Sequence, residues 1–195
     1  MGFRICYIAA QMSLDDVVEG LSLELGEKTD EQPFDDDWIA HQQETGFTIL
    51  WSGDEGYAFR QSKRLAELSN RACVYSAQIS ETVMCSDAVC YENGKEHWRI
   101  MHQGFDGQLE KNTSILGAAL PEFEQEMERQ RAAAAAETSD DVDYFFDVPV
   151  NVLQKKIGFR YDQMLSLSNG MQFFEVVSKP EVTARKGFWP KLLGK

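Results

Sequence analysis

The sequence predicts an α+β fold, with a mostly antiparallel sheet of about six strands and three or four helices packed on it. Two hairpin patterns support the sheet, one centred on residues 44–46 and one on Asn93-Gly94. A capped amphipathic pattern that begins at Ser13 indicates a helix that docks on this sheet.

The chain begins with a strand followed by a helix. Residues 3–10 form a mostly apolar run that predicts a strand. The run is short, is interrupted by Arg4 and leads directly into a helix start, so a signal peptide is not expected. Ser13 has the position of an N-cap residue, with Asp16 three residues later. Apolar residues then follow at helical spacing, which predicts an amphipathic helix against the sheet.

The stretch from residue 26 to residue 72 contains a loop, a hairpin and a helix. Residues 26–34 are polar and include Pro33, so we expect a loop there. Within 38–51, two strand-like runs flank a turn and predict the first hairpin. Residues 53–72 become helical toward their middle, with the apolar side chains on one side.

The clearest strand signal lies between residues 73 and 102. Runs rich in β-forming residues at 73–79, 82–91 and 96–102 predict three strands. Asn93-Gly94 separates the last two runs, and this dipeptide favours a type I′ turn because both central residues need a positive φ.

The last third of the chain predicts two helices and two strands. Residues 121–136 form a mostly polar helical stretch that starts with a proline, so we expect a surface helix. Residues 142–146 read as a strand, and residues 149–158 as a short helix that ends at a glycine. A final strand is predicted at 172–178.

Composition predicts one globular domain in a reducing compartment. The hydrophobic fraction of 43% is ordinary for such a domain, which we assign to residues 1–178, followed by a basic, loosely held tail at 179–195. The four cysteines are too few and too irregularly spaced for a disulfide framework. No apolar run approaches the about 18 residues of a membrane span. We therefore expect a cytoplasmic protein.

The net charge of −13 is unevenly distributed. Residues 1–60 hold 3 basic and 13 acidic residues, and residues 121–148 hold 2 and 9. Residues 149–195 have the opposite balance, with 8 basic and 3 acidic residues. A negative field serves solubility, repels nucleic acids and anionic membranes, and accelerates encounter with basic proteins. The charge therefore favours a basic protein partner and neither nucleic acid nor membrane.

Cysteines and histidines of the second hairpin suggest a zinc site or a nucleophile. A two-residue turn places Cys90 opposite His97 and Cys85 opposite His102. Positions 85 and 90 differ in parity, so the two pairs face opposite sides of the sheet and a four-ligand zinc site is not expected. Cys90 and His97 remain a candidate nucleophile and base, against the simpler interpretation of a cross-strand pair.

Other catalytic motifs are absent. The sequence contains no nucleophile elbow, no phosphate-binding glycine loop and no zinc-protease helix motif. The consecutive aspartates near residue 36 lack the alternating ligands of a calcium loop. We therefore predict no cofactor and no metal.

Two groups of acidic residues are predicted to contact a partner. One is the stretch at 30–38, where aspartates lie next to a tryptophan, and the other is the glutamate face of the predicted 121–131 helix. Acids beside aromatic side chains are typical of a protein-binding surface. The predicted contact residues are Asp30, Glu31, Asp35, Asp36, Asp37, Trp38, Glu122, Glu124, Glu126 and Glu128.

Three segments together resemble small acidic bacterial proteins of the immunity type, which protect cells from interbacterial toxins. They are MGFRICYIAA at 1–10, SETVMCSDAVCYENGKEHWRIMHQG at 80–104 and DVDYFFDVPVNVLQKKIGFRYD at 141–162. The resemblance carries over no catalytic residues. It implies a cytosolic protein that binds and blocks a cognate toxin domain, and many such toxins are basic nucleases.

We therefore predict a non-enzymatic immunity protein that occludes the active site of a basic toxin. Two other functions remain open from the residues. One is a small enzyme of unknown reaction that uses Cys90 and His97. The other is an acidic mimic of nucleic acid that sequesters a basic protein.

Overall fold

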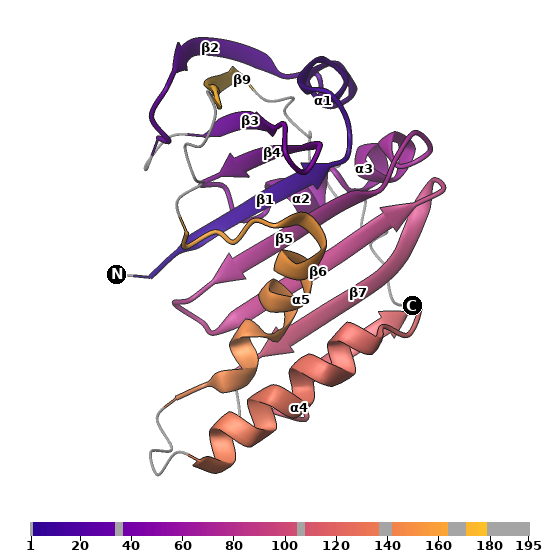
Figure 1. Ribbon diagram of the computed structural model, residues 1–195, viewed down its shortest axis with the longest axis vertical. Helices are drawn as coiled ribbons and strands as arrows, with labels where there is room; N and C mark the ends of the chain where they lie inside the picture. The colour runs from indigo at the N-terminus through magenta and orange to yellow at the C-terminus, as the bar shows by residue number, and fades with distance from the viewer. Residues whose placement is uncertain (1, 34–36, 105–107, 137–141, 164–170, 179–195) are drawn as a thin grey trace, which may run out of the picture.

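The computed structural model describes residues 2–33, 37–104, 108–136, 142–163 and 171–178, and the predicted tail lies outside them. Within these ranges the chain forms one nine-stranded antiparallel sheet and five α-helices (Figure 1). The predicted α+β class is confirmed, whereas the expected numbers of strands and helices were too low.

Strands from both ends of the chain lie side by side in the sheet, whose order is β2-β9-β3-β4-β1-β5-β6-β7-β8. The strands are β1 (Arg4–Ala10), β2 (Glu24–Thr29), β3 (Trp38–Gln42), β4 (Phe47–Ser52), β5 (Val74–Ser80), β6 (Cys85–Glu92), β7 (Lys95–Gln103), β8 (Thr113–Gly117) and β9 (Phe173–Ser178). The helices are α1 (Leu14–Leu21), α2 (Tyr57–Arg60), α3 (Ser62–Leu68), α4 (Pro121–Ala136) and α5 (Val148–Ile157), with a 3₁₀-helix η1 (Tyr144–Asp147).

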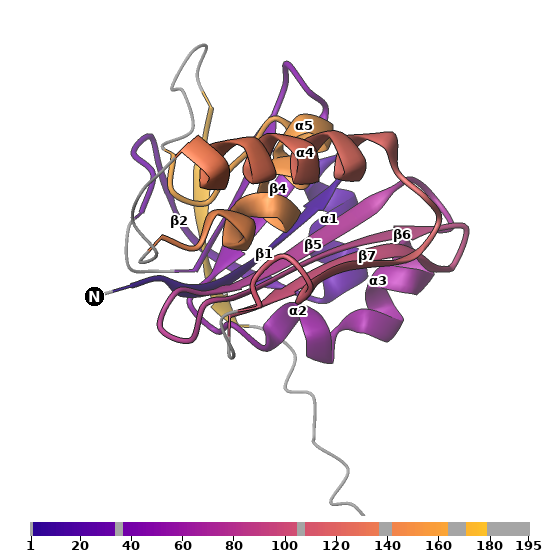
Figure 2. The same ribbon diagram turned by 90° about the horizontal axis from the view of Figure 1, so that it is seen from below.

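Helices cover both faces of the sheet and divide the core into two parts (Figure 2). α1, α2 and α3 pack on one face, where Ile8 of β1 and Leu65 of α3 belong to one buried cluster. α4, α5 and η1 pack on the other face, where Trp38 of β3 and Phe159, which follows α5, belong to the second cluster. The central strand β1 is covered on both sides, so all its residues after Arg4 are buried.

Several local predictions are confirmed. Ser13 caps α1, with its Oγ accepting a hydrogen bond from the N–H of Asp16 at 3.2 Å. Gly158 ends α5 with a φ of 73°. Asn93 and Gly94 have φ angles of 53° and 79°, as a type I′ turn requires.

Two local predictions were wrong, and β8 was not predicted. Residues 26–34, expected to be a loop, contain most of β2, which lies at the edge of the sheet. An edge strand open to solvent needs no apolar run, and charged residues protect it from pairing with another chain. Residues 142–146 do not form a strand, because the Asp143 carboxylate accepts the N–H groups of Phe145 and Phe146, both at 3.1 Å, and starts η1.

The register of the β6–β7 hairpin differs from the predicted one because of a β-bulge. Beyond the turn, Cys90 pairs with Trp98 instead of His97. Cys85 likewise pairs with Gln103, one residue beyond its predicted partner. His97 is the extra residue of the bulge, so every later side chain of β7 points to the face opposite to the predicted one.

Candidate functional site

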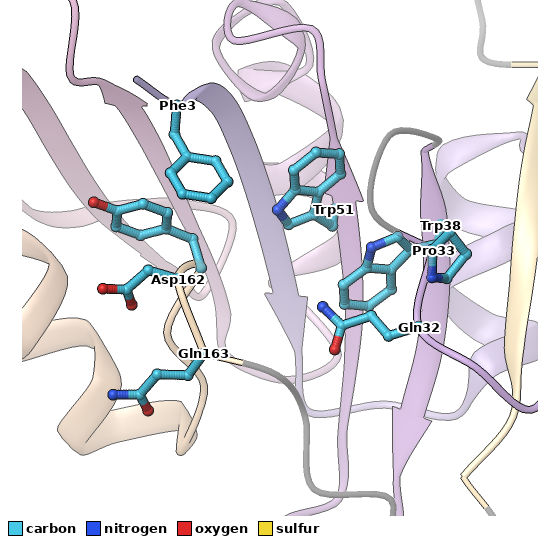
Figure 3. Close-up of a pocket in the computed structure, with 8 residues that line it drawn as sticks. Phe3, Gln32, Pro33, Trp38, Trp51, Asp162 and Gln163 are labelled. Atoms are coloured by element: carbon cyan, nitrogen blue, oxygen red, sulfur yellow. The ribbon is translucent and has the colours of Figure 1, made fainter. Parts of the chain in front are cut away.

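A pocket of about 80 Å³ opens near the start of the central strand β1 (Figure 3). Its lining comes from segments that are far apart in the sequence. Phe3, Tyr161, Asp162 and Gln163 line one side, and Gln32, Pro33, Trp38 and Trp51 line the other. The pocket is therefore assembled only by the complete fold.

Two tryptophans make one wall of this pocket rigid. Trp38 and Trp51 are opposite each other on β3 and β4, with ring centroids 6.5 Å apart and ring planes at 3°. Trp38 also contacts Phe159 and Phe173 edge-to-face, with centroids at 6.1 and 5.2 Å. Such contacts fix ring orientation, so this wall is formed before any ligand arrives.

Glu81 holds the other wall together. Its Oε2 accepts the backbone N–H of Phe3, and its Oε1 accepts the hydroxyl of Tyr161, both at 2.8 Å. The rings of Phe3 and Tyr161 meet edge-to-face with centroids 5.3 Å apart. Burial, and then the hydrogen bond to Glu81, raise the pKa of Tyr161, so its hydroxyl stays protonated and donates at neutral pH.

Carboxylates near the pocket differ in what balances their charge. Arg4 donates to Glu55 through two nitrogens, at 2.6 and 3.2 Å. Arg160 Nε donates to Asp162 at 2.7 Å. Among the described residues, Glu81 forms no ion pair, because both of its hydrogen-bond donors are uncharged. Within these residues, no cationic side chain balances the charge of Glu81 beside the aromatic wall.

The predicted acidic stretch flanks this pocket, since residues 32, 33 and 38 belong to its lining. Asp30 and Glu31 are exposed, and Asp37 is half-buried. Trp38 is fully buried, so it supports the pocket from within instead of offering an exposed contact. The two other members of the group, Asp35 and Asp36, lie outside the described residues.

The second predicted group, on α4, lies elsewhere. Figure 1 shows α4 beside β7, across the sheet from β2 and β3, so the two acidic groups do not form one surface. Glu124 and Glu128 are exposed on α4, and Glu122 pairs with Lys156 at 2.5 Å. Glu126 is buried with 0% exposure, so it is not at the surface to contact a partner.

Glu126 instead joins α4 to α5. Its Oε1 accepts hydrogen bonds from Gln130 and Asn151, both at 2.8 Å, and its Oε2 accepts from Lys155 at 3.0 Å. Arg129 forms an ion pair with it as well. Burial raises the pKa of this carboxyl, but the four donors together outweigh burial and lower the pKa to about 2.

The structure does not place Cys90 opposite His97. Cys90 is buried opposite Trp98, and burial raises the pKa of its thiol to about 12. A thiol that is protonated at neutral pH is a poor nucleophile. His97 lies instead 3.7 Å from the carboxylate of Glu92. In the described ranges, no group of three or more histidine, cysteine or acidic side chains has the geometry to hold a metal ion.

The hydrogen bonds of the buried His102 in β7 were not predicted from the sequence, which placed this histidine opposite Cys85. His102 Nε2 lies 2.8 Å from Asp143 Oδ2, and Nδ1 lies 2.8 Å from Thr113 Oγ1. Thr113 donates in turn to the carbonyl of Leu109 at 3.0 Å. The side chain of His102 is 0% exposed, so a substrate has no access to it. The group therefore links β7, β8 and the start of η1.

Asp87 on β6 makes a pH-dependent contribution to stability. Burial raises its pKa to about 6, although Arg99 Nη1 lies 3.2 Å from its Oδ2. A pKa above the unfolded value means that this contribution is present below about pH 4 and is lost as the pH rises through about 6. Relative to Asp87→Asn, the wild type is expected to lose roughly 2 kcal/mol of unfolding free energy between about pH 4 and pH 7.

Urea denaturation of both proteins at the two pH values measures this difference. The Asn variant does not titrate in this range, so other groups cancel in the comparison. If the difference in unfolding free energy between the wild type and Asp87→Asn were the same at both pH values, the pKa of Asp87 would not be raised in the folded state.

The residues that sequence reasoning missed at the pocket are Phe3, Glu81 and Tyr161. Each comes from a different part of the chain, and no local motif marks any of them. Only Trp38, next to acidic residues, gave a signal of a binding surface.

Comparisons with protein-family models, curated proteins and solved structures found no match to this chain. Across the described ranges, no helix has both the length and the apolar character needed to cross a lipid bilayer. A proposal for the function therefore has to be argued from the pocket and the charges beside it.

Proposed function

We propose that this protein is a non-enzymatic immunity protein, which acts in the cytoplasm by binding a basic toxin domain and blocking its active site. The observation that carries the proposal is the rigid aromatic pocket flanked by carboxylates near the start of β1. A central aromatic anchor position with a charged rim is typical of specific protein interfaces. That the partner is a toxin rests on the resemblance of the sequence to immunity proteins.

The charge next to the pocket supports a basic partner. Asp30 and Glu31 are exposed and directly precede Gln32, which lines the pocket. Carboxylates concentrated beside a binding site raise the association rate with a cationic protein and disfavour anionic ones.

Affinity capture of the tagged protein from its own host tests the proposal. We expect one near-stoichiometric polypeptide that survives moderate salt, is toxic when expressed without this protein and is harmless when both are expressed. An empty eluate would contradict the proposal. A set of basic proteins that is lost at moderate salt would contradict it too, and would favour a nucleic-acid mimic.

Association kinetics with the captured protein distinguish the two acidic groups. The double variant Asp30→Asn and Glu31→Gln is expected to lower the association rate about three- to tenfold at low salt and to weaken its salt dependence. The matched control, Glu124→Gln with Glu128→Gln, changes the net charge equally on the distant helix α4. Equal effects of the two double variants would show that net charge, and not the acidic stretch, governs association.

A further inference from the structure

We propose that the pocket binds an arginine side chain of the basic partner. This inference rests on the proposed function, because it names the group that the partner inserts. The pocket offers apolar ring surface from Phe3 and Trp51, and an uncompensated carboxylate, Glu81, behind the wall that Phe3 and Tyr161 form. A cation with a flat, weakly hydrated head fits this combination.

Glu81 favours a cation over a neutral side chain. Both of its oxygens accept hydrogen bonds from uncharged donors, and in the described part of the chain no cationic side chain forms an ion pair with it. By accepting the hydroxyl hydrogen of Tyr161, the carboxylate also increases the electron density of that ring. Aromatic faces attract cations through their negative quadrupole, and a nearby carboxylate strengthens this attraction.

The neighbouring Arg160 does not cancel this preference. Its guanidinium carbon lies 5.8 Å from the centroid of the Tyr161 ring, and its charge is balanced by Asp147 at 2.9 Å and Asp162 at 2.7 Å. The Tyr161 ring thus already has one guanidinium beside it, whose positive charge is balanced by two carboxylates.

The form of the pocket favours arginine over lysine. A guanidinium is planar and weakly hydrated, so it is easier to desolvate than an ammonium group on entering an apolar space. Gln32 and Gln163 lie on opposite sides of the pocket, so polar amide groups border the space that the guanidinium enters (Figure 3).

Titration of the ¹⁵N-labelled protein with three capped amino acids tests the ligand class. The probes are the N-acetyl methylamides of arginine, lysine and citrulline, and citrulline has nearly the shape of arginine without its charge. We expect arginine to shift the indole N–H signals of Trp38 and Trp51 saturably, with citrulline at least about tenfold weaker and lysine weaker than arginine. No saturable shift with arginine, or an equal response to citrulline or lysine, would overturn the inference.

Two exposed phenylalanines provide a matched pair of variants. Phe3 is 42% exposed and lines the pocket, whereas Phe59 on α2 is 65% exposed and does not line it. Phe3→Ala is expected to weaken arginine binding about tenfold, and Phe59→Ala is expected to leave it within about twofold. Equal losses from both variants would overturn the assignment of the pocket.

A charge variant tests the role of the carboxylate. Glu81→Gln keeps a hydrogen-bonding side chain at the wall but removes the charge, so we expect weaker arginine binding and unchanged citrulline binding. An unchanged preference for arginine over citrulline would contradict the role of Glu81. The backbone amide spectrum away from the pocket reports whether each variant is folded.

The captured partner separates this inference from the proposed function. If the partner binds Phe3→Ala as tightly as the wild-type protein, the arginine pocket is wrong and the proposed function stands. If no partner is captured, the proposed function itself fails.

Discussion

Replacing Glu126 with alanine is expected to lower the free energy of unfolding by about 3–5 kcal/mol. The carboxylate is 0% exposed and accepts hydrogen bonds from Gln130, Asn151, Lys155 and Arg129. Alanine would leave the buried amides of Gln130 and Asn151 without their acceptor and would open a gap between α4 and α5. Urea denaturation followed by circular dichroism measures the loss.

The matched control is Glu124→Ala on the same helix. Glu124 is exposed, and its replacement changes the charge and the helix propensity in the same way. We expect a change within about 0.5 kcal/mol. If Glu126→Ala and Glu124→Ala had the same unfolding free energy, the buried hydrogen bonds of Glu126 would add nothing to stability beyond what an exposed glutamate adds.

The pH dependence of the Glu126 effect has a definite sign. A pKa of about 2 lies below the value of an unfolded glutamate, so the ionised carboxylate is favoured in the folded state. Its contribution is complete above about pH 5 and is lost as the pH falls through about 2. The stability difference between wild type and Glu126→Gln should therefore narrow on acidification, which is opposite to the trend expected for Asp87.

The hairpin turn was predictable from the sequence, but the faces of β7 were not. Asn93-Gly94 determines the pairs next to the turn, because few dipeptides adopt two positive φ angles. The bulge at His97 has no comparable marker, since it uses neither glycine nor proline. One extra residue reverses the two faces of a strand, so Trp98 enters the core beneath α5 and His102 reaches η1.

At the candidate site, too, local sequence patterns predicted some features, whereas contacts between residues far apart in the chain could not be predicted. The charge pattern and Trp38 in the acidic stretch pointed to a binding surface. The pocket itself depends on Glu81 bonding to Phe3 and to Tyr161, 78 and 80 residues away in the chain. Periodicity and capping motifs describe neighbours within a few residues, so they carry no information on such contacts. The inward orientation of Glu126 depends in the same way on α5.

Replacing His102 with alanine is expected to destabilise the protein by about 3–5 kcal/mol. His102 and Asp143 are 0% and 8% exposed, and their side chains lie 2.8 Å apart. Without the imidazole, a nearly buried carboxylate loses its partner and a cavity remains beneath Phe146, whose ring meets His102 edge-to-face at 6.4 Å. The contact between β7 and η1 is expected to weaken first, because Asp143 also begins η1.

His97 is the natural control for this substitution, because it is a histidine on the same strand whose side chain is 41% exposed. His97→Ala is expected to change the unfolding free energy by less than about 0.5 kcal/mol. Equal unfolding free energies for the two variants would contradict the structural role of the His102–Asp143 pair. A large loss confined to His102→Ala would show that the fold depends on the His102–Asp143 pair, which forms because the bulge at His97 turns His102 toward Asp143.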